Sequence, residues 1–236
     1  LEVRVANFSN NHRIIILRDM AYENNIQNMR KEFVSNFSHE LKTPLTVILG
    51  FLETLQMSTS NKENEKKIID LMNNQAYRMK SLIDDLLLLS NVESNNEINR
   101  SEKINISLLL KEIKKNIAEI NGVNHKFIFS IDSKLNIYGA KHEVLSAFSN
   151  LITNAIRYTP KKGRIDVRWN QVGEHAVFEV VDSGIGIAET ELAKVSNRFY
   201  RVDPDRSRNT GGTGLGLAIV KNVMMQHQGE LKISSK

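Results

Sequence analysis

Two long stretches of the sequence repeat their apolar residues at helical spacing, and this repetition constrains the fold most. In residues 21–57 the apolar positions follow at intervals of three and four: Val34, Phe37, Leu41, Leu45, Ile48, Leu52 and Leu55. A second series follows: Ile68, Met72, Ala76, Met79, Ile83, Leu86 and Leu89. Such spacing places apolar side chains along one face of an α-helix. Because only the short polar segment 58–62 separates the series, the sequence predicts an antiparallel helical hairpin.

A hairpin of two helices leaves part of each apolar stripe uncovered. Two hairpins that pair into a four-helix bundle would cover both stripes, so the sequence predicts a homodimer. The alternative is a hairpin that packs against a second domain of its own chain. The chain has 236 residues, which is enough for two domains.

The segments on either side of the hairpin differ in pattern. Residues 1–19 hold two β-rich runs around Asn10-Asn11-His12, which predicts a β-hairpin that ends a domain begun upstream. Residues 20–93 form the helical domain, and the polar segment 94–102 is the predicted linker. For residues 103–236 the patterns predict strands at 103–106, 126–131, 164–172, 176–181 and 230–234, and helices at 107–120, 140–158 and 213–226. This alternation predicts an α+β chain whose second domain is an α/β sandwich.

Composition excludes several classes of protein. The absence of cysteine rules out disulfides and thiolate metal sites. No apolar run reaches the roughly 18 residues that span a bilayer. The net charge is +5, but the lysines are dispersed, so we expect no direct binding of nucleic acid.

His39 is the candidate phosphate acceptor of the helical hairpin. It follows Phe37 by two residues, about 200° around a helix, and therefore points away from the apolar stripe. An exposed histidine on a helix usually has no function, but its neighbours change this interpretation. Pro44 inside the helix frees a backbone carbonyl near residue 40, at a cost of about 3 kcal/mol. Imidazole is a nucleophile near neutral pH, and Glu40 can hold its second nitrogen.

Three segments of the second domain have the features of a nucleotide site. Asn150 and Asn154 lie four apart on one helix face, and amide oxygens suit Mg²⁺. Asp182 ends a strand beside Gly184 and Gly186, where we expect a buried carboxylate that accepts from the amine of adenine.

The third segment, 212–217, has the sequence Gly-Thr-Gly-Leu-Gly-Leu and opens a helix, as phosphate sites do. Arg157 and Tyr158 add a cation for phosphate and a ring for stacking. Each of these segments alone also occurs in proteins without a nucleotide site. The sequence has no P-loop and no dinucleotide fingerprint, which disfavours other nucleotide folds.

Taken together, the motifs resemble those of the sensor histidine kinases of two-component systems. Residues 37–46 match the H box of that family, 150–159 its N box, 182–187 its first glycine box, 198–201 its F box and 212–220 its second glycine box. All five occur in the family's order, which is far more specific than any one motif. Residues 29–39 and 202–212 further resemble the phosphate-regulon branch of the family.

The resemblance implies a role for each matching residue. His39 would accept the γ-phosphoryl group of ATP and pass it to an aspartate of a response regulator. Glu40 would be its acid/base neighbour, and Thr43 would orient water for dephosphorylation of the regulator. Asn154 would hold Mg²⁺. The implied ATP-binding set is Asn150, Asn154, Arg157, Tyr158, Asp182, Gly184, Gly186, Arg201, Gly212, Thr213, Gly214, Leu215 and Gly216.

The resemblance also implies features of the larger protein. Residues 187–212 would form a mobile lid over ATP. Residues 1–19 would be the last strands of a PAS-type sensor domain, and a closing strand would follow Ser235. The implied input is phosphate limitation. The chain would be the cytoplasmic portion of a bacterial inner-membrane protein, attached through a segment upstream of residue 1.

Two rival functions remain. ATP hydrolases of the gyrase and heat-shock chaperone type have a similar pocket, but they carry a glutamate that activates water where this chain has Asn150, and an amide cannot act as that base. The other rival is a dimeric scaffold with a degenerate pocket. The presence of Asn154, Asp182 and Gly214 argues against it.

Overall fold

The computed structural model describes residues 2–9, 12–18, 21–57, 62–93, 102–120, 125–202 and 213–235. The chain divides into two compact units, Leu1–Ala76 and Tyr77–Lys236. The boundary falls inside helix α2 (Lys62–Glu93), so the second half of this helix belongs to the same unit as the α/β sandwich. The domain boundaries drawn from the sequence stay a prediction, and most of the predicted linker lies outside the described residues.

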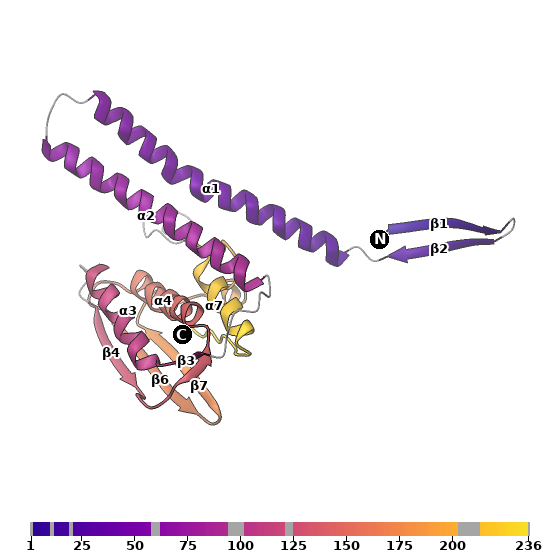
Figure 1. The fold of residues 1–236 in the computed structure, drawn as a ribbon. Coiled ribbons are helices and arrows are strands. Elements are labelled where there is room, and N and C mark those ends of the chain that lie inside the picture. The colour runs from indigo at the N-terminus through magenta and orange to yellow at the C-terminus, as the bar shows by residue number, and fades with distance from the viewer. Residues whose placement is uncertain are drawn as a thin grey trace. The chain divides into compact units, whose positions relative to one another are not determined.

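The first unit begins with a β-hairpin and continues into a long helix (Figure 1). Strands β1 (Glu2–Ser9) and β2 (His12–Arg18) pair antiparallel, as the two β-rich runs predicted. Helix α1 (Ala21–Met57) runs without interruption through Pro44, which is buried. Several hydroxyl groups of α1 donate hydrogen bonds to backbone carbonyls one turn earlier in the helix. The Ser38 Oγ, for example, donates to the Val34 carbonyl at 2.8 Å. The two predicted long helices are therefore confirmed.

The core of the second unit is the sheet β4–β6–β7. Strands β4 (Lys126–Ile131) and β6 (Arg164–Val172) pair parallel, and β6 pairs antiparallel with β7 (His175–Asp182) across a turn at Gly173, whose φ is +60°. Ile165, Val167 and Trp169 alternate along β6 and are buried. Ile165 is in register with Asp182, so the Asp182 side chain leaves β7 on the same face of the sheet as these apolar residues.

Helices α3 (Ile106–Ile120), α4 (Lys141–Tyr158) and α7 (Gly216–Gln226) lie beside this sheet (Figure 1). The Asn105 side chain caps α3 by accepting from the Leu108 N–H at 3.1 Å. Helix α4 ends at Tyr158 because Pro160 holds Thr159 in an extended conformation. The described buried apolar residues of these helices are Ile106, Leu109, Leu110, Ile113, Ile117, Val144, Ala147, Phe148, Ile152, Ala155, Ala218, Ile219, Val220 and Val223.

Aromatic side chains join α4 to the sheet. Phe148 of α4 stacks on Phe178 of β7 with ring centroids 3.7 Å apart, and its centroid lies 5.9 Å from that of Trp169. The Trp169 Nε1–H donates to the Leu135 carbonyl at 3.0 Å, so the buried indole has its polar atom satisfied. A second small sheet pairs β3 (Glu102–Ile104) with β5 (Ile137–Gly139). The predicted α/β sandwich is confirmed.

Some element predictions were wrong. Residues 230–234 are not a strand: their side chains alternate in burial, but they form no ladder with the described residues, and alternation alone cannot supply the hydrogen-bonded neighbour. The helix predicted from Thr213 begins at Gly216. Strand β5 and the four-residue helix α5 (Glu189–Leu192) were missed because both are too short to show a period. Across the described residues, no helix is long and apolar enough to cross a membrane.

Candidate nucleotide site and acceptor histidine

His39 lies on the exposed surface of α1, as predicted from its angle to the apolar stripe. Thr43 lies one turn later, and its Oγ1 donates to the His39 carbonyl at 3.2 Å. Pro44 has no N–H, so the carbonyl of Glu40 lacks its ordinary helical donor. Glu40 itself is half-buried. The result is an accessible imidazole, followed one turn later by a proline that interrupts the regular hydrogen bonds of the helix.

The two asparagines of α4 contact the first turn of α7. The Asn150 Nδ2 donates to the Ser146 carbonyl at 3.1 Å, which turns its Oδ1 toward α7. A Cβ on Gly216 would lie 2.7 Å from this Oδ1 and 3.5 Å from the Asn154 Nδ2. Only glycine leaves room for the start of α7 to approach both amides. The structure therefore brings the N box and the second glycine box together.

Asp182 and Tyr158 meet at Gly184. The Asp182 Oδ1 accepts from the Gly184 N–H at 2.8 Å, and the Tyr158 carbonyl accepts from the Ile185 N–H at 3.3 Å. A Cβ on Gly184 would lie 2.5 Å from that Oδ1 and 2.7 Å from that carbonyl oxygen. The expectation of a buried Asp182 was wrong, because this carboxylate is exposed. It lies at the end of β7 beside two glycines, which have no side chains to cover it.

The F box contacts the second glycine box through its backbone. The Phe199 N–H donates to the Gly214 carbonyl at 2.8 Å, and a Cβ on Gly214 would lie 2.7 Å from the Phe199 Cα. Gly214 has φ +71°, a conformation that favours glycine. The hydroxyl of Tyr200, the next residue, donates to Glu191 of α5. This contact between α5 and the F box was not predicted, since no periodic pattern marks it.

Arg157 lies at the end of α4 in a cationic environment that includes α2. Burial lowers the pKa of its guanidinium; the positive charges of Arg201 and Arg78 lower it further, whereas Tyr158 and Asp85 act in the opposite direction. Burial also raises the pKa of Asp85 to about 6; Asp84 raises it as well, and Arg157 opposes the rise. Arg78 and Asp85 belong to α2 and were absent from the predicted site. No local motif of the sequence marks either residue.

For the remaining predicted residues, the structure gives burial and local backbone contacts. Thr213 is half-buried and its Oγ1 accepts from the Leu215 N–H at 3.2 Å, while Leu215 is fully buried. Gly186 is exposed with φ +71°. Gly212 and the part of the predicted lid from residue 203 onward lie outside the described residues. The described part of the chain holds no cluster of three or more histidine or acidic residues that could bind a metal without a ligand's help.

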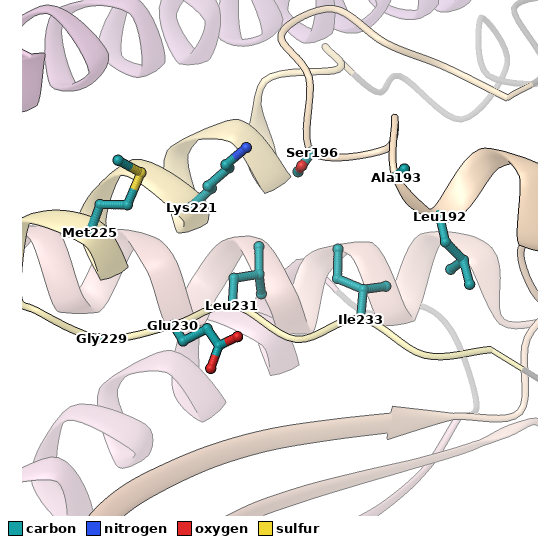
Figure 2. A pocket seen from close by; sticks show the side chains of 9 residues that line it. All are labelled: Leu192, Ala193, Ser196, Lys221, Met225, Gly229, Glu230, Leu231 and Ile233. Carbon is teal, nitrogen blue, oxygen red and sulfur yellow. The ribbon is translucent and has the colours of Figure 1, made fainter.

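A cavity of about 320 Å³ lies between α5, α7 and the segment that follows α7. Figure 2 shows the side chains that line it. Lys221 and Met225 of α7 line it together with Leu231 and Ile233, which belong to the segment after that helix. None of the predicted ATP-binding residues line this cavity. It is therefore distinct from the cluster of motifs around α4.

Comparison with known proteins agrees with this geometry. Residues 29–95 match the His Kinase A (phospho-acceptor) domain, and residues 139–236 match the family of histidine kinase-, DNA gyrase B- and HSP90-like ATPases. The chain belongs to the sensor histidine kinases. It is 40% identical over its whole length to the phosphate regulon sensor protein PhoR of Pseudomonas aeruginosa and 35% identical to that of Haemophilus influenzae. It spans 54% and 55% of these relatives, about half their length.

Solved structures support the fold. Histidine kinase AdeS of Acinetobacter baumannii aligns with a TM-score of 0.62 over 80% of this chain and 86% of its own, at 24% identity. Histidine kinase ThkA, in a complex with response regulator protein TrrA, aligns with a TM-score of 0.66 over 94% of this chain and 66% of its own, at 21% identity. The arrangement of a helical pair followed by an α/β ATPase fold is thus shared with these kinases.

Proposed function

We propose that this chain is an ATP-dependent protein-histidine autokinase that phosphorylates His39 and passes the phosphoryl group to an aspartate of a response regulator. The observation that carries the proposal is the gathering of the N, F and two glycine boxes around α4, in a chain that also presents an exposed histidine on α1. The family matches over both regions support it. An amide at Asn150, in place of a carboxylate, favours transfer over hydrolysis.

The acceptor chemistry follows from the exposure of His39. An unprotonated imidazole nitrogen attacks the γ-phosphorus, a P–N bond forms, and the bond to the β,γ-bridging oxygen breaks to release ADP. Glu40 accepts a hydrogen bond from the other ring nitrogen and stabilises the positive charge that develops there. In the second transfer the phosphoryl group moves from nitrogen to a carboxylate oxygen of the regulator, which restores the free imidazole.

The ATP site follows from the cluster around α4. Asp182 accepts from the exocyclic amine of adenine, and Tyr158, which is 37% exposed, offers its ring to the base. The N-terminus of α7 from Thr213 to Gly216 faces the phosphates. Arg157 and Arg201 supply cations for phosphate oxygens.

A magnesium ion fits the amides at Asn154. The described residues hold no acidic cluster, and Mg²⁺ commonly takes few protein ligands and keeps waters and substrate phosphates. Asn154 is half-buried next to the open position at Gly216, with Asn150 beside it. Bound there, the ion would neutralise charge on the transferred phosphoryl group.

Labelled ATP tests the acceptor. Incubation of the chain with γ-labelled ATP and Mg²⁺ should leave acid-labile, base-stable label on the protein, and His39→Ala should abolish it. His142→Ala, at another exposed histidine, is the matched control and should keep the label. Label that survives in His39→Ala would reject the acceptor. Free phosphate alone would favour the hydrolase, and an absence of ATP binding would favour the scaffold.

The partners are also proposed. ThkA has been solved in complex with a response regulator protein, which supports a regulator as the partner of this chain. The match to the phospho-acceptor domain supports a homodimer through α1 and α2. The names of the two PhoR relatives support phosphate limitation as the input. Attachment to a membrane through a segment outside residues 1–236 is proposed only from the resemblance to the family.

Thr43 separates kinase from phosphatase activity. We expect Thr43→Ala to keep labelling of His39 within about twofold, but to slow dephosphorylation of the regulator by roughly 10²-fold because a water-orienting hydroxyl is lost. The measurement is the decay of label on purified phosphorylated regulator. Thr46→Ala, at the next exposed threonine of α1, is the control. Equal decay in all three proteins would remove Thr43 from the site.

A further inference from the structure

The pairing of β6 with β7 ends in a hydrogen bond to a side chain. Ile165 and Asp182 are the last residues in register, and Arg164 and Ser183 come next. The Ser183 N–H donates to the Arg164 carbonyl at 3.0 Å, as in a regular antiparallel ladder. The Arg164 N–H, however, donates to the Ser183 Oγ at 2.8 Å, so the hydroxyl takes the place of the Ser183 carbonyl. The backbone can therefore leave the sheet at Ser183 while the Arg164 N–H stays satisfied.

The start of β6, to which Ser183 is bound, is itself fixed on two sides. The Lys126 N–H of β4 donates to the Gly163 carbonyl at 2.9 Å. The Arg164 guanidinium donates twice to the buried Asp166, from Nε at 2.7 Å and from Nη2 at 2.7 Å. A Cβ on Gly163 would lie 3.0 Å from the Ser183 Oγ, so glycine leaves room for the hydroxyl. The end of β7 is thus attached to a well-held part of the sheet.

Asp182 depends on this attachment for its position. Its carboxylate is exposed, so packing does not fix it. Its Oδ1 accepts from the Gly184 N–H, in the turn that begins where Ser183 leaves the sheet. Among the described residues, no hydrogen bond occupies the Asp182 Oδ2. One carboxylate oxygen is therefore used to form the turn, and the other is available to a ligand.

We propose that the hydroxyl of Ser183 makes this chain selective for a purine with a 6-amino group. Because the hydroxyl ends β7 at a fixed point, it holds the Asp182 carboxylate where its second oxygen accepts from that amine. This inference rests on the proposed function, which assigns Asp182 to adenine. It adds the residue that fixes the carboxylate. Ser183 is a positioning residue, since its hydroxyl binds the backbone of β6 and not the nucleotide.

Removal of the hydroxyl should affect the base more than the phosphates. In Ser183→Ala the Arg164 N–H must turn to the carbonyl of residue 183 or to water. The first choice extends the ladder by one pair and opposes the turn at Gly184, and the second loosens the end of β7. Either change moves Asp182 relative to the amine. The start of α7, which faces the phosphates in the proposed site, is held by other contacts.

Two nucleotides test this selectivity. Purine ribonucleoside triphosphate has a hydrogen atom where ATP has its 6-amino group, so the ratio of its Kd to that of ATP, both with Mg²⁺, measures the contact with the amine. Titration calorimetry should give a ratio above one for the unaltered chain. Ser183→Ala should lower this ratio by about threefold to tenfold, the range that the loss of one hydrogen bond produces. A merely structural loss would raise both Kd values equally and keep the ratio, which would overturn the inference.

An isosteric pair of variants isolates the hydroxyl. Ser183→Thr keeps it and should keep the ratio within about twofold, whereas Ser183→Val has the same shape without it and should lower the ratio as alanine does. Ser130→Ala, at an exposed serine of β4, is the control and should leave the ratio unchanged. Equal ratios in the threonine and valine variants would overturn the inference. Should Ser183→Ala not fold, as judged by circular dichroism, this pair decides by itself.

The two proposals fail in different ways. If the unaltered chain binds neither nucleotide, the proposed function fails. If it binds both with equal Kd, the assignment of Asp182 to the amine fails, and the selectivity fails with it. If it prefers ATP and Ser183→Ala keeps the full preference, only the role of Ser183 fails.

Discussion

The close approach of α7 to the asparagines of α4 depends on the absence of a side chain at Gly216. In Gly216→Ala the new Cβ would lie 2.7 Å from the Asn150 Oδ1, so either the amide or the first turn of α7 must move. We expect the Kd for ATP with Mg²⁺ to rise by about tenfold, because both the amides and the helix start would leave their positions. Titration calorimetry gives this value directly.

Gly50→Ala is the matched control for that substitution. Gly50 is also helical, but a Cβ there meets nothing within 4 Å. Alanine should therefore stabilise α1 by about 0.5–1 kcal/mol and leave the Kd for ATP unchanged. If both alanine variants bind ATP like the unaltered chain, close contact between α7 and the asparagines is not required for the nucleotide.

At the scale of the element, α2 should have a stability that depends on pH through Asp85. Its pKa is raised from 3.8 to about 6, mainly by burial and also by Asp84, with Arg157 opposing. Between pH 3.8 and about 6, Asp85 therefore keeps its proton in the folded state but loses it in the unfolded state. Stability linked to Asp85 is full below about pH 4, and it falls as the pH rises through 6.

Asp85→Asn removes this dependence. Its melting temperature should exceed that of the unaltered chain at pH 7, and the difference should close as the pH falls toward 4. Asp70→Asn, at an exposed position of the same helix, should show no such trend. Scanning calorimetry between pH 4 and 8 measures all three proteins. A difference that stays constant across this range would contradict the burial of an ionised Asp85.

Local patterns predicted the long elements well and the short ones poorly. Helices α1 and α2 could be predicted because their apolar spacing persists over many turns. Strand β4 was predicted with its observed bounds. The three residues of β5 could not be, because their pairing with β3 depends on a distant part of the chain. Residues 230–234 show the opposite error, since alternation without a partner does not make a strand.

At the scale of the whole molecule, the helical pair still offers apolar surface for a partner. Leu45, Leu49, Leu52 and Ile69 are 46%, 52%, 41% and 49% exposed. Leu49→Lys should weaken the proposed homodimer by at least about tenfold in Kd, because a charge at a helix interface is costly to bury. Asn73→Lys, at an exposed polar position, is the control. Sedimentation that shows equal dimerisation in both variants would place the interface elsewhere.

The residues of the site that belong to local sequence motifs could be predicted, and those that do not could not. Asn150, Asn154, Asp182 and Gly216 could be predicted from residue type and spacing. The fold places Gly216 against both asparagines, and Asp182 contacts Gly184 beside Tyr158. Asp85 and Arg78 could not be found in this way, because their importance comes from the packing of α2 in the second unit. The exposure of Asp182 was missed for a similar reason, since burial depends on what covers a strand end.

Trp169 gives the protein a built-in optical reporter. It is the only tryptophan of the chain, it is 2% exposed, and its ring lies beside Phe148 on the helix that carries both asparagines. Changes in its emission will therefore follow events in the catalytic domain. The proposed association of the helical pairs and the proposed chemistry at His39 involve α1 and α2, which do not carry this fluorophore. Fluorescence of a single unlabelled sample can thus distinguish nucleotide binding from dimer assembly.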